Sequence, residues 1–146
     1  PSLAIVVKKY DGSNWTNVDS TGLHLGQTFS LNLSLDNDTP YVAYSHYSTA
    51  FNVDVKKFNG STWVDVGSNS ISNSSTNPNP NIAVDNGIPY LSYSENTPSN
   101  KCSVIKYDGS NWITVGTTGF SAGQVIRTNI ALDNGIYIRS PSKGRI

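Results

Sequence analysis

Few side chains in this sequence have the type and spacing that catalysis needs. Glycoside hydrolysis uses two carboxyl groups that face each other across the scissile bond, and the one glutamate, Glu95, has no convincing companion. The histidines, His24 and His46, stand apart from each other, and a single cysteine, Cys102, excludes an internal disulfide and a cysteine zinc site. We therefore predict no catalytic residue, no metal site and no cofactor, and a glycoside hydrolase is the third of three functional hypotheses.

Other side chains could bind a ligand without transforming it. The tryptophans and some tyrosines could stack on a sugar ring, although aromatic residues repeated at one strand position more often pack inside the protein. Asparagines that recur at strand starts could ring a channel mouth, or they could satisfy local backbone groups. The candidate ligand-binding residues are Trp15, Trp63, Trp112, Tyr44, Tyr93, Asn32, Asn81 and Asn129.

Aspartates also recur, at Asp36, Asp85 and Asp133. Each is followed by asparagine, and Asx side chains close turns on their own backbone. The run of residues 36–38 hints at a calcium loop, but no acidic residue follows at the required spacing. These aspartates are therefore predicted to form hairpins.

The chain repeats itself. Residues 9–15 read Lys-Tyr-Asp-Gly-Ser-Asn-Trp, and close copies occupy residues 57–63 and 106–112, so that the tryptophans lie 48 and then 49 residues apart. A fixed period of this size indicates a repeat array. We predict one domain over residues 1–146, with repeats at about 3–50, 51–99 and 100–146.

Each full repeat is predicted to contain four short strands. Alternating apolar and polar residues indicate strands, and Asp-Gly or Asn-Gly pairs favour tight hairpins between them. The predicted strands are 3–10, 15–18, 31–35, 40–44, 53–58, 63–66, 81–84, 89–93, 102–107, 112–115, 129–132 and 136–138. The chain thus holds two whole four-stranded units, preceded by the last two strands of a unit and followed by the first two.

The repeat resembles bacterial β-propeller blades of the kelch-like and sialidase-like kind. The resemblance lies in a small-apolar strand, an Asp-Asn-Gly turn, Pro-Tyr-x-x-Tyr and Lys-Tyr-Asp-Gly-Ser-x-Trp. It implies an all-β fold of four-stranded antiparallel blades, three blades per chain. The sialidase Asp-box spacing, Asp-x-Gly-x-x-Trp, and the arginine cluster of sialidases have no match here, so the resemblance implies architecture and not activity.

Three blades are too few for a ring, because propellers typically use four to eight. Six is the multiple of three within that range. We therefore expect a homodimer in which the terminal hairpin of each chain completes a blade with the first hairpin of the other. The alternative is a fragment of a longer propeller, which the atypical tail at residues 139–146 keeps open.

Composition narrows the choice of partners. The formal net charge is zero and 14% of residues are charged, which argues against nucleic acid, where clustered basic side chains are needed. No run of about 18 apolar residues predicts a membrane span. The chain begins with Pro1 and contains no methionine, so we expect a processed N-terminus and favour a secreted or cell-surface location.

The connections between repeats vary in length, and variable loops on a repeated scaffold are where recognition usually resides. These connections are residues 19–28, 45–52, 67–80, 95–101 and 116–128. The leading hypothesis is a non-catalytic, lectin-like module that binds a glycan through this loop face. The alternative is a protein-interaction or structural scaffold without a small ligand.

Overall fold

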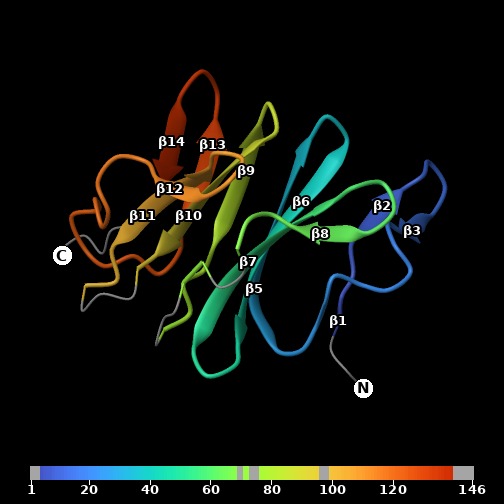
Figure 1. Ribbon diagram of the computed structural model, residues 1–146, viewed down its shortest axis with the longest axis horizontal. Coiled ribbons are helices and arrows are strands. Elements are labelled where there is room, and N and C mark those ends of the chain that lie inside the picture. The colour runs from blue at the N-terminus through green and yellow to red at the C-terminus, as the bar shows by residue number, and fades with distance from the viewer. Residues whose placement is uncertain (1–3, 69–70, 73–75, 96–98, 140–146) are drawn as a thin grey trace.

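The computed structural model describes residues 4–68, 71–72, 76–95 and 99–139, and its regular structure is β-strand throughout. The strands pair antiparallel and form neighbouring sheets that follow one another along the chain (Figure 1). The predicted all-β class is therefore confirmed. The described residues form no closed ring.

Two four-stranded sheets form the centre of the molecule. Their strands are β5 (Thr28–Asp36), β6 (Thr39–Tyr47), β7 (Phe51–Phe58) and β8 (Trp63–Asp65) in one sheet, and β9 (Asn81–Asp85), β10 (Ile88–Ser94), β11 (Cys102–Tyr107) and β12 (Trp112–Thr114) in the other. Each sheet keeps the order of its strands in the sequence. The two predicted four-stranded units are confirmed.

A two-stranded hairpin lies at each end of the described chain. The first joins β2 (Lys8–Tyr10) to β3 (Trp15–Asn17), and the last joins β13 (Asn129–Leu132) to β14 (Ile136–Arg139). These are the expected half units. Residues 140–146, which include most of the atypical tail, lie outside the described residues.

The predicted strand at residues 3–10 is wrong in one respect, because it is interrupted. A separate strand, β1 (Ala4–Ile5), pairs with β4 (His24–Leu25), inside what we expected to be a connection. After β3 the regular β2–β3 pairing stops, but the following backbone still bonds to the first segment of the chain. Val18 N–H donates to Val7 O, and Leu23 N–H donates to Ile5 O, both at 2.9 Å.

The same departure recurs in both four-stranded sheets. Val66 N–H donates to Val55 O, and Val115 N–H donates to Val104 O. The fourth strand of each unit is therefore short, because regular pairing ends at the same repeat position, just before Val66 and Val115.

The predicted hairpins have the backbone geometry that their residues favour. Asn86 and Gly87 both have positive φ, 50° and 76°, as a type I′ turn between twisted strands requires. In the other hairpin type, the Asp11 carboxylate accepts hydrogen bonds from Ser13 N–H and Asn14 N–H, each at 2.8 Å.

The core lies between sheets, because the second strand of each unit is covered on both faces. Tyr41 and Ala43 of β6 pack toward the second sheet. Val42 and Tyr44 pack on the other face, against Ile5, Val7 and Leu23, which flank the first hairpin in the chain. Side chains that alternate along a strand point to opposite faces. A strand between two packed layers therefore reads as a continuous apolar run.

One expectation about packing is wrong. The alternation of large and small residues in the first strand of each unit predicts that its large apolar side chains are buried between sheets. Ile82 and Ile130 are 4% and 5% exposed, but their counterpart Leu33 is 48% exposed. The physical reason is that the unit before β5 lacks its first two strands, so no described strand covers this part of its face.

Candidate ligand-binding face

Antiparallel order sorts the connections onto two ends of the molecule. The tight β5–β6, β9–β10 and β13–β14 turns lie together at the top of Figure 1, and the β6–β7 connection lies at the bottom. We call the lower end, which also receives the chain before β5, β9 and β13, the loop end. The sheets thus bring the starts of β5, β9 and β13 to the loop end.

Asparagine side chains join these three strands. Asn32 Oδ1 accepts a hydrogen bond from Ile82 N–H, and Asn81 Oδ1 accepts one from Ile130 N–H, both at 3.1 Å. Asn129 occupies the same position on β13 and is exposed. The side-chain Oδ1 atoms of Asn32 and Asn81 therefore hold neighbouring strands together. Their Nδ2 groups have no hydrogen-bond partner among the described residues.

A cleft of about 280 Å³ opens beside these amides. Arg127 and Asn79 line it together with Asn32 and Asn81, and Phe29 forms part of its wall. Guanidinium and amide N–H groups are donors. Asn79 Nδ2 already donates to Asn77 O and Ile126 O, so the donors that the cleft presents to a ligand come from Arg127, Asn32 and Asn81.

A hydrogen-bonded network fixes the floor of the cleft. Ser30 Oγ donates to Asn79 Oδ1 at 2.6 Å, and Asn79 Nδ2 donates to Ile126 O at 2.8 Å. Beneath them, Ser45 Oγ donates to Asn77 Oδ1 at 2.8 Å. Three segments that are distant in sequence are thereby held at one place.

Aromatic rings adjoin the cleft. The Phe29 and Phe51 ring centroids lie 4.9 Å apart, and those of Tyr47 and Phe51 lie 5.1 Å apart, both in edge-to-face geometry. Phe29 is 44% exposed and Tyr47 is 50% exposed. An amphipathic ring at a wet surface offers an apolar body and, for tyrosine, a polar tip.

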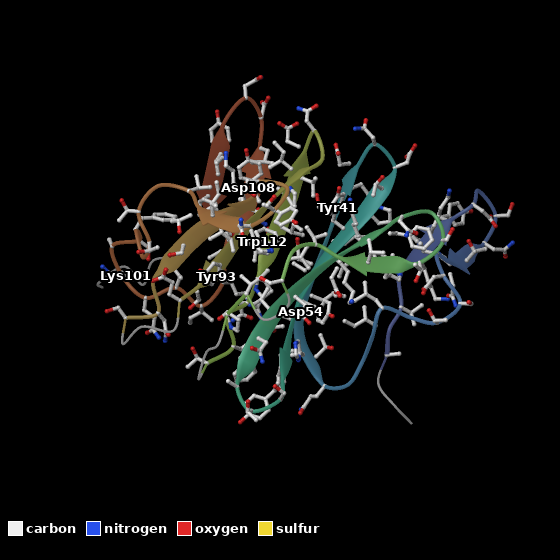
Figure 2. The ribbon with its side chains drawn as sticks, viewed as in Figure 1. Tyr41, Asp54, Tyr93, Lys101, Asp108 and Trp112 are labelled. Carbon is white, nitrogen blue, oxygen red and sulfur yellow. The ribbon has the colours of Figure 1, made fainter. Side chains whose placement is uncertain are left out.

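The two predicted tyrosines are placed differently. Tyr44 is fully buried, and its hydroxyl donates to Asp54 Oδ2 at 3.3 Å, an oxygen that also lies 3.1 Å from His46 Nε2. Burial, with the nearby Asp54 charge, raises the pKa of Tyr44 well above its usual value. Tyr93 is half-buried in the core of the second sheet (Figure 2). The ring of Tyr44 therefore offers no surface to a ligand.

The three tryptophans do not gather around the asparagines. Trp112 Nε1 donates to Val66 O of the preceding sheet at 3.0 Å. Trp63 packs against the apolar cluster that contains Ile5 and Val7, and no described residue accepts a hydrogen bond from its buried Nε1. Trp15 is 67% exposed. Trp63 and Trp112 thus pack between sheets.

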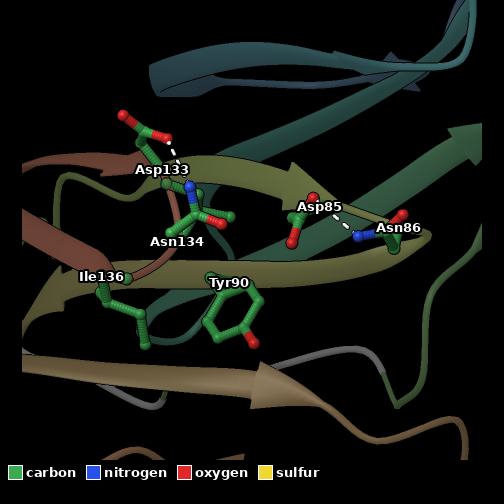
Figure 3. Close-up of a pocket in the computed structure, with 8 residues that line it drawn as sticks. Asp85, Asn86, Tyr90, Asp133, Asn134 and Ile136 are labelled. Carbon is green, nitrogen blue, oxygen red and sulfur yellow. Dashed lines mark hydrogen bonds between the residues drawn. The ribbon is translucent and has the colours of Figure 1, made fainter.

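Asp85 and Asp133 lie at the opposite end, around a hollow of about 380 Å³ (Figure 3). Asn86 Nδ2 donates to Asp85 Oδ1 at 3.0 Å, and Asn134 Nδ2 donates to Asp133 Oδ1 at 3.2 Å. These two carboxylates therefore bond within their own hairpins. Asp36 differs in part, because its Oδ2 accepts a hydrogen bond from Gly87 N–H of the next hairpin at 2.7 Å. Over the described ranges, no group of three or more His, Cys, Asp or Glu side chains could hold a metal ion.

Glu95 takes part in a local structural network. The Ser103 hydroxyl donates to Glu95 Oε1, and Ser103 Oγ accepts a hydrogen bond from Gly119 N–H at 2.6 Å. This arrangement ties the β10–β11 connection to the segment after β12. It supplies no catalytic role for Glu95.

Sequence reasoning missed Phe29, Asn79 and Arg127. A signal for two of them exists, because Asn79 and Arg127 stand two residues before Asn81 and Asn129 in the repeat, where Ser30 precedes Asn32. A strand-start position whose residue type changes in each repeat could have indicated a recognition site. Phe29 carries no such signal.

Among known proteins, no family model and no curated protein matches this chain. Within the described part of the structure, no helix has the length and apolar character needed to cross a bilayer.

Proposed function

We propose that this chain is a non-catalytic β-propeller binding module whose ligand is a carbohydrate. The observation that carries the proposal is the juxtaposition at the loop end of free amide donors with exposed aromatic rings. Asn32 and Asn81 each direct one oxygen to a neighbouring strand and keep their Nδ2 groups available. Sugar hydroxyl and ring oxygens are acceptors that such groups can bind.

The blade geometry of the proposal rests on the repeated sheets. The first strand of each four-stranded sheet is hydrogen-bonded to the first strand of the unit that follows. The bond is made by the asparagine at the same repeat position, Asn32 in one sheet and Asn81 in the other. Sheets stacked in this manner around an axis are the arrangement of a propeller. In the proposed assembly, a second copy of the chain completes a six-bladed ring.

The test is glycan binding to the intact protein, with variants chosen to separate donors from fold. Asn32→Asp keeps an oxygen for Ile82 N–H and removes the Nδ2 donor, so binding should weaken about tenfold while stability is retained. Tyr47→Ala should weaken binding by removing the exposed ring. Ile88→Ala removes an apolar side chain that is 40% exposed on the opposite end, and it should leave binding unchanged.

Failure of the wild-type protein to bind any member of a glycan panel at millimolar sugar would overturn the carbohydrate proposal. Binding that survives both Asn32→Asp and Tyr47→Ala would place the ligand elsewhere.

A second candidate function is a protein-interaction scaffold that uses the same face. The observation that favours it is the exposed apolar surface of Phe29, Leu31 and Tyr47, at 44%, 53% and 50%, since exposed apolar patches mark interaction sites. In that case Tyr47→Ala would abolish capture of a protein partner, and no glycan would compete.

A further inference from the structure

The two ends of the chain carry complementary halves of an interface that the chain already makes internally. At the internal interface, the second four-stranded sheet sits on the first. A Cβ built on Gly67 would lie 2.8 Å from Trp112 Nε1 and 2.8 Å from a Tyr107 ring carbon. Gly67 therefore leaves room for the ring of Trp112, whose indole N–H donates to Val66 O. We call this contact site, formed by Val66 and Gly67, the tryptophan seat.

The second sheet has the same seat, and no described residue occupies it. Val115 and Gly116 follow β12 as Val66 and Gly67 follow β8, and Gly116 has φ of 72° where Gly67 has 75°. A Cβ built on Gly116 meets no described atom within 4 Å. The seat at Gly116 is thus formed and open.

The first hairpin carries the residues that would fill such a seat. Trp15 and Tyr10 stand where Trp112 and Tyr107 stand in the repeat, and their rings keep the same 5.5 Å centroid separation. Trp15 is 67% exposed and Tyr10 is 53% exposed. The Tyr107–Trp112 pair is thus packed against the first sheet, whereas the equivalent Tyr10–Trp15 pair of the first hairpin is exposed.

An apolar cleft lies beside this hairpin. It has a volume of about 720 Å³ and runs between β2–β3 and β5, where Val7, Leu33 and Leu35 line it. Leu33 and Leu35 are 48% and 63% exposed. In the complete sheets this position is filled by the first two strands of the unit, which are the strands that the first hairpin lacks.

The last hairpin, β13–β14, consists of those two strands. Its Tyr137 stands where Tyr41 and Tyr90 stand, and it is 61% exposed, whereas Tyr41 is 5% exposed beneath the next sheet. Within the complete sheets, Tyr41 pairs with Lys57 and Tyr90 pairs with Lys106. The equivalent partner of Tyr137 is Lys9, and that of Ile138 is Lys8.

We propose that the cleft beside β2–β3 binds the β13–β14 hairpin of a second copy of this chain, while Trp15 rests on Gly116 of that copy. Two such contacts, related by a two-fold axis, close the ring of the two copies. The inference rests on the ring proposed above and does not depend on its ligand. The proposed pairing between the two copies ends after Ile138, because Arg139 stands where Ala43 and Ser92 are fully buried.

Cysteine cross-linking tests the register directly. Lys9→Cys protein is mixed with Tyr137→Cys protein and oxidised in air; directly paired residues in antiparallel strands have Cα separations of about 4.5–5.5 Å, within disulfide range. The expected product is a covalent pair of unlike chains at twice the 15.7 kDa chain mass. The native Cys102 is fully buried and should not interfere.

Lys8→Cys mixed with Tyr137→Cys is the matched control, because a one-residue shift points the side chain to the other face. Equal cross-linking in the two mixtures, or none in either, would overturn the proposal. In a separate sample of the double variant Lys9→Cys/Tyr137→Cys, closure by two copies gives only a linked pair, and a ladder of three or more linked chains would overturn it.

Light scattering on single variants gives a second measurement. Trp15→Ala should lower the mass toward one chain without changing the far-ultraviolet spectrum, and Tyr47→Ala should keep the mass of the wild type. A wild-type protein that has the mass of one chain at every concentration would overturn the proposal. Dimerisation without glycan binding would overturn only the carbohydrate ligand, whereas glycan binding by a single chain would overturn the ring and this inference but leave the carbohydrate ligand standing.

Discussion

The indole N–H of Trp112 and the carbonyl oxygen of Val66 form a hydrogen bond of 3.0 Å that joins two sheets 46 residues apart in sequence. The corresponding indole of Trp63 is buried, and its Nε1 has no acceptor among the described residues. Two equivalent tryptophans thus differ in one hydrogen bond, which makes them a matched pair for measuring its contribution.

Trp112→Phe should therefore destabilise the protein more than Trp63→Phe. The first substitution removes a hydrogen bond worth about 1 kcal/mol, and the second removes a donor that is already unsatisfied. Urea denaturation should show an additional loss of about 1 kcal/mol in the free energy of unfolding for Trp112→Phe. Equal losses would show that the indole bond contributes nothing to stability.

The asparagine between β9 and β13 predicts a second difference. Asn81→Leu removes the acceptor for Ile130 N–H and leaves that amide unpaired between strands, which costs about 1–3 kcal/mol. Asn81→Asp keeps an acceptor and should retain most of the stability at neutral pH. Thermal unfolding of both variants checks this expectation, and a stable Asn81→Leu protein would contradict the structural role of the amide.

The hairpin aspartates should respond to acid. Hydrogen bonds from the backbone N–H groups of Asn14 and Ser13 lower the pKa of Asp11 below 3.8. A lowered folded-state pKa stabilises the protein above the unfolded-state value, and this contribution is lost as the pH falls through the folded-state pKa. Carboxyl titration by NMR should find Asp11 titrating below 3.8.

Asn59 supplies the natural control for Asp11. Its Oδ1 accepts from Ser61 N–H and Thr62 N–H at 2.9 Å in the equivalent turn. Asp11→Asn should therefore keep the turn and remove its pH dependence, whereas Asp11→Ala should lose both. An acid response unchanged in Asp11→Asn would contradict this assignment.

Cys102 should be inert in the folded protein. Burial, and then the charge of Glu95, raise the pKa of its thiol from 9.0 to about 11. Because the thiolate is the reactive form, alkylation at pH 8 should proceed only after unfolding. Rapid labelling of the native protein would contradict the buried position.

The same raised pKa has a consequence for stability. Its contribution is fully present below pH 9.0 and is lost as the pH rises toward about 11. Cys102→Ala should reduce the alkaline decline in the free energy of unfolding. Since burial also raises the pKa of Tyr44 and Tyr93, part of the decline should persist in this variant.

The sequence by itself determined the elements and their order. Period-two alternation and the Asn86-Gly87 type of turn act over a few residues, so each strand and hairpin is specified by its own neighbours. The two complete sheets and the two terminal hairpins follow from this local chemistry. The break between β1 and β2 does not, because it depends on where the chain after β3 leaves the ladder.

Only the tertiary structure decided which side chains are available to a ligand or partner. Tyr44 is buried against Ile5, Val7 and Leu23, whereas Leu33 is left exposed beside the short β2–β3 hairpin, although both occupy repeated apolar positions. The cleft brings Arg127 beside Asn32 across three strands. Exposure and proximity of this kind are set by neighbouring sheets about one repeat away in sequence, and no local pattern encodes them.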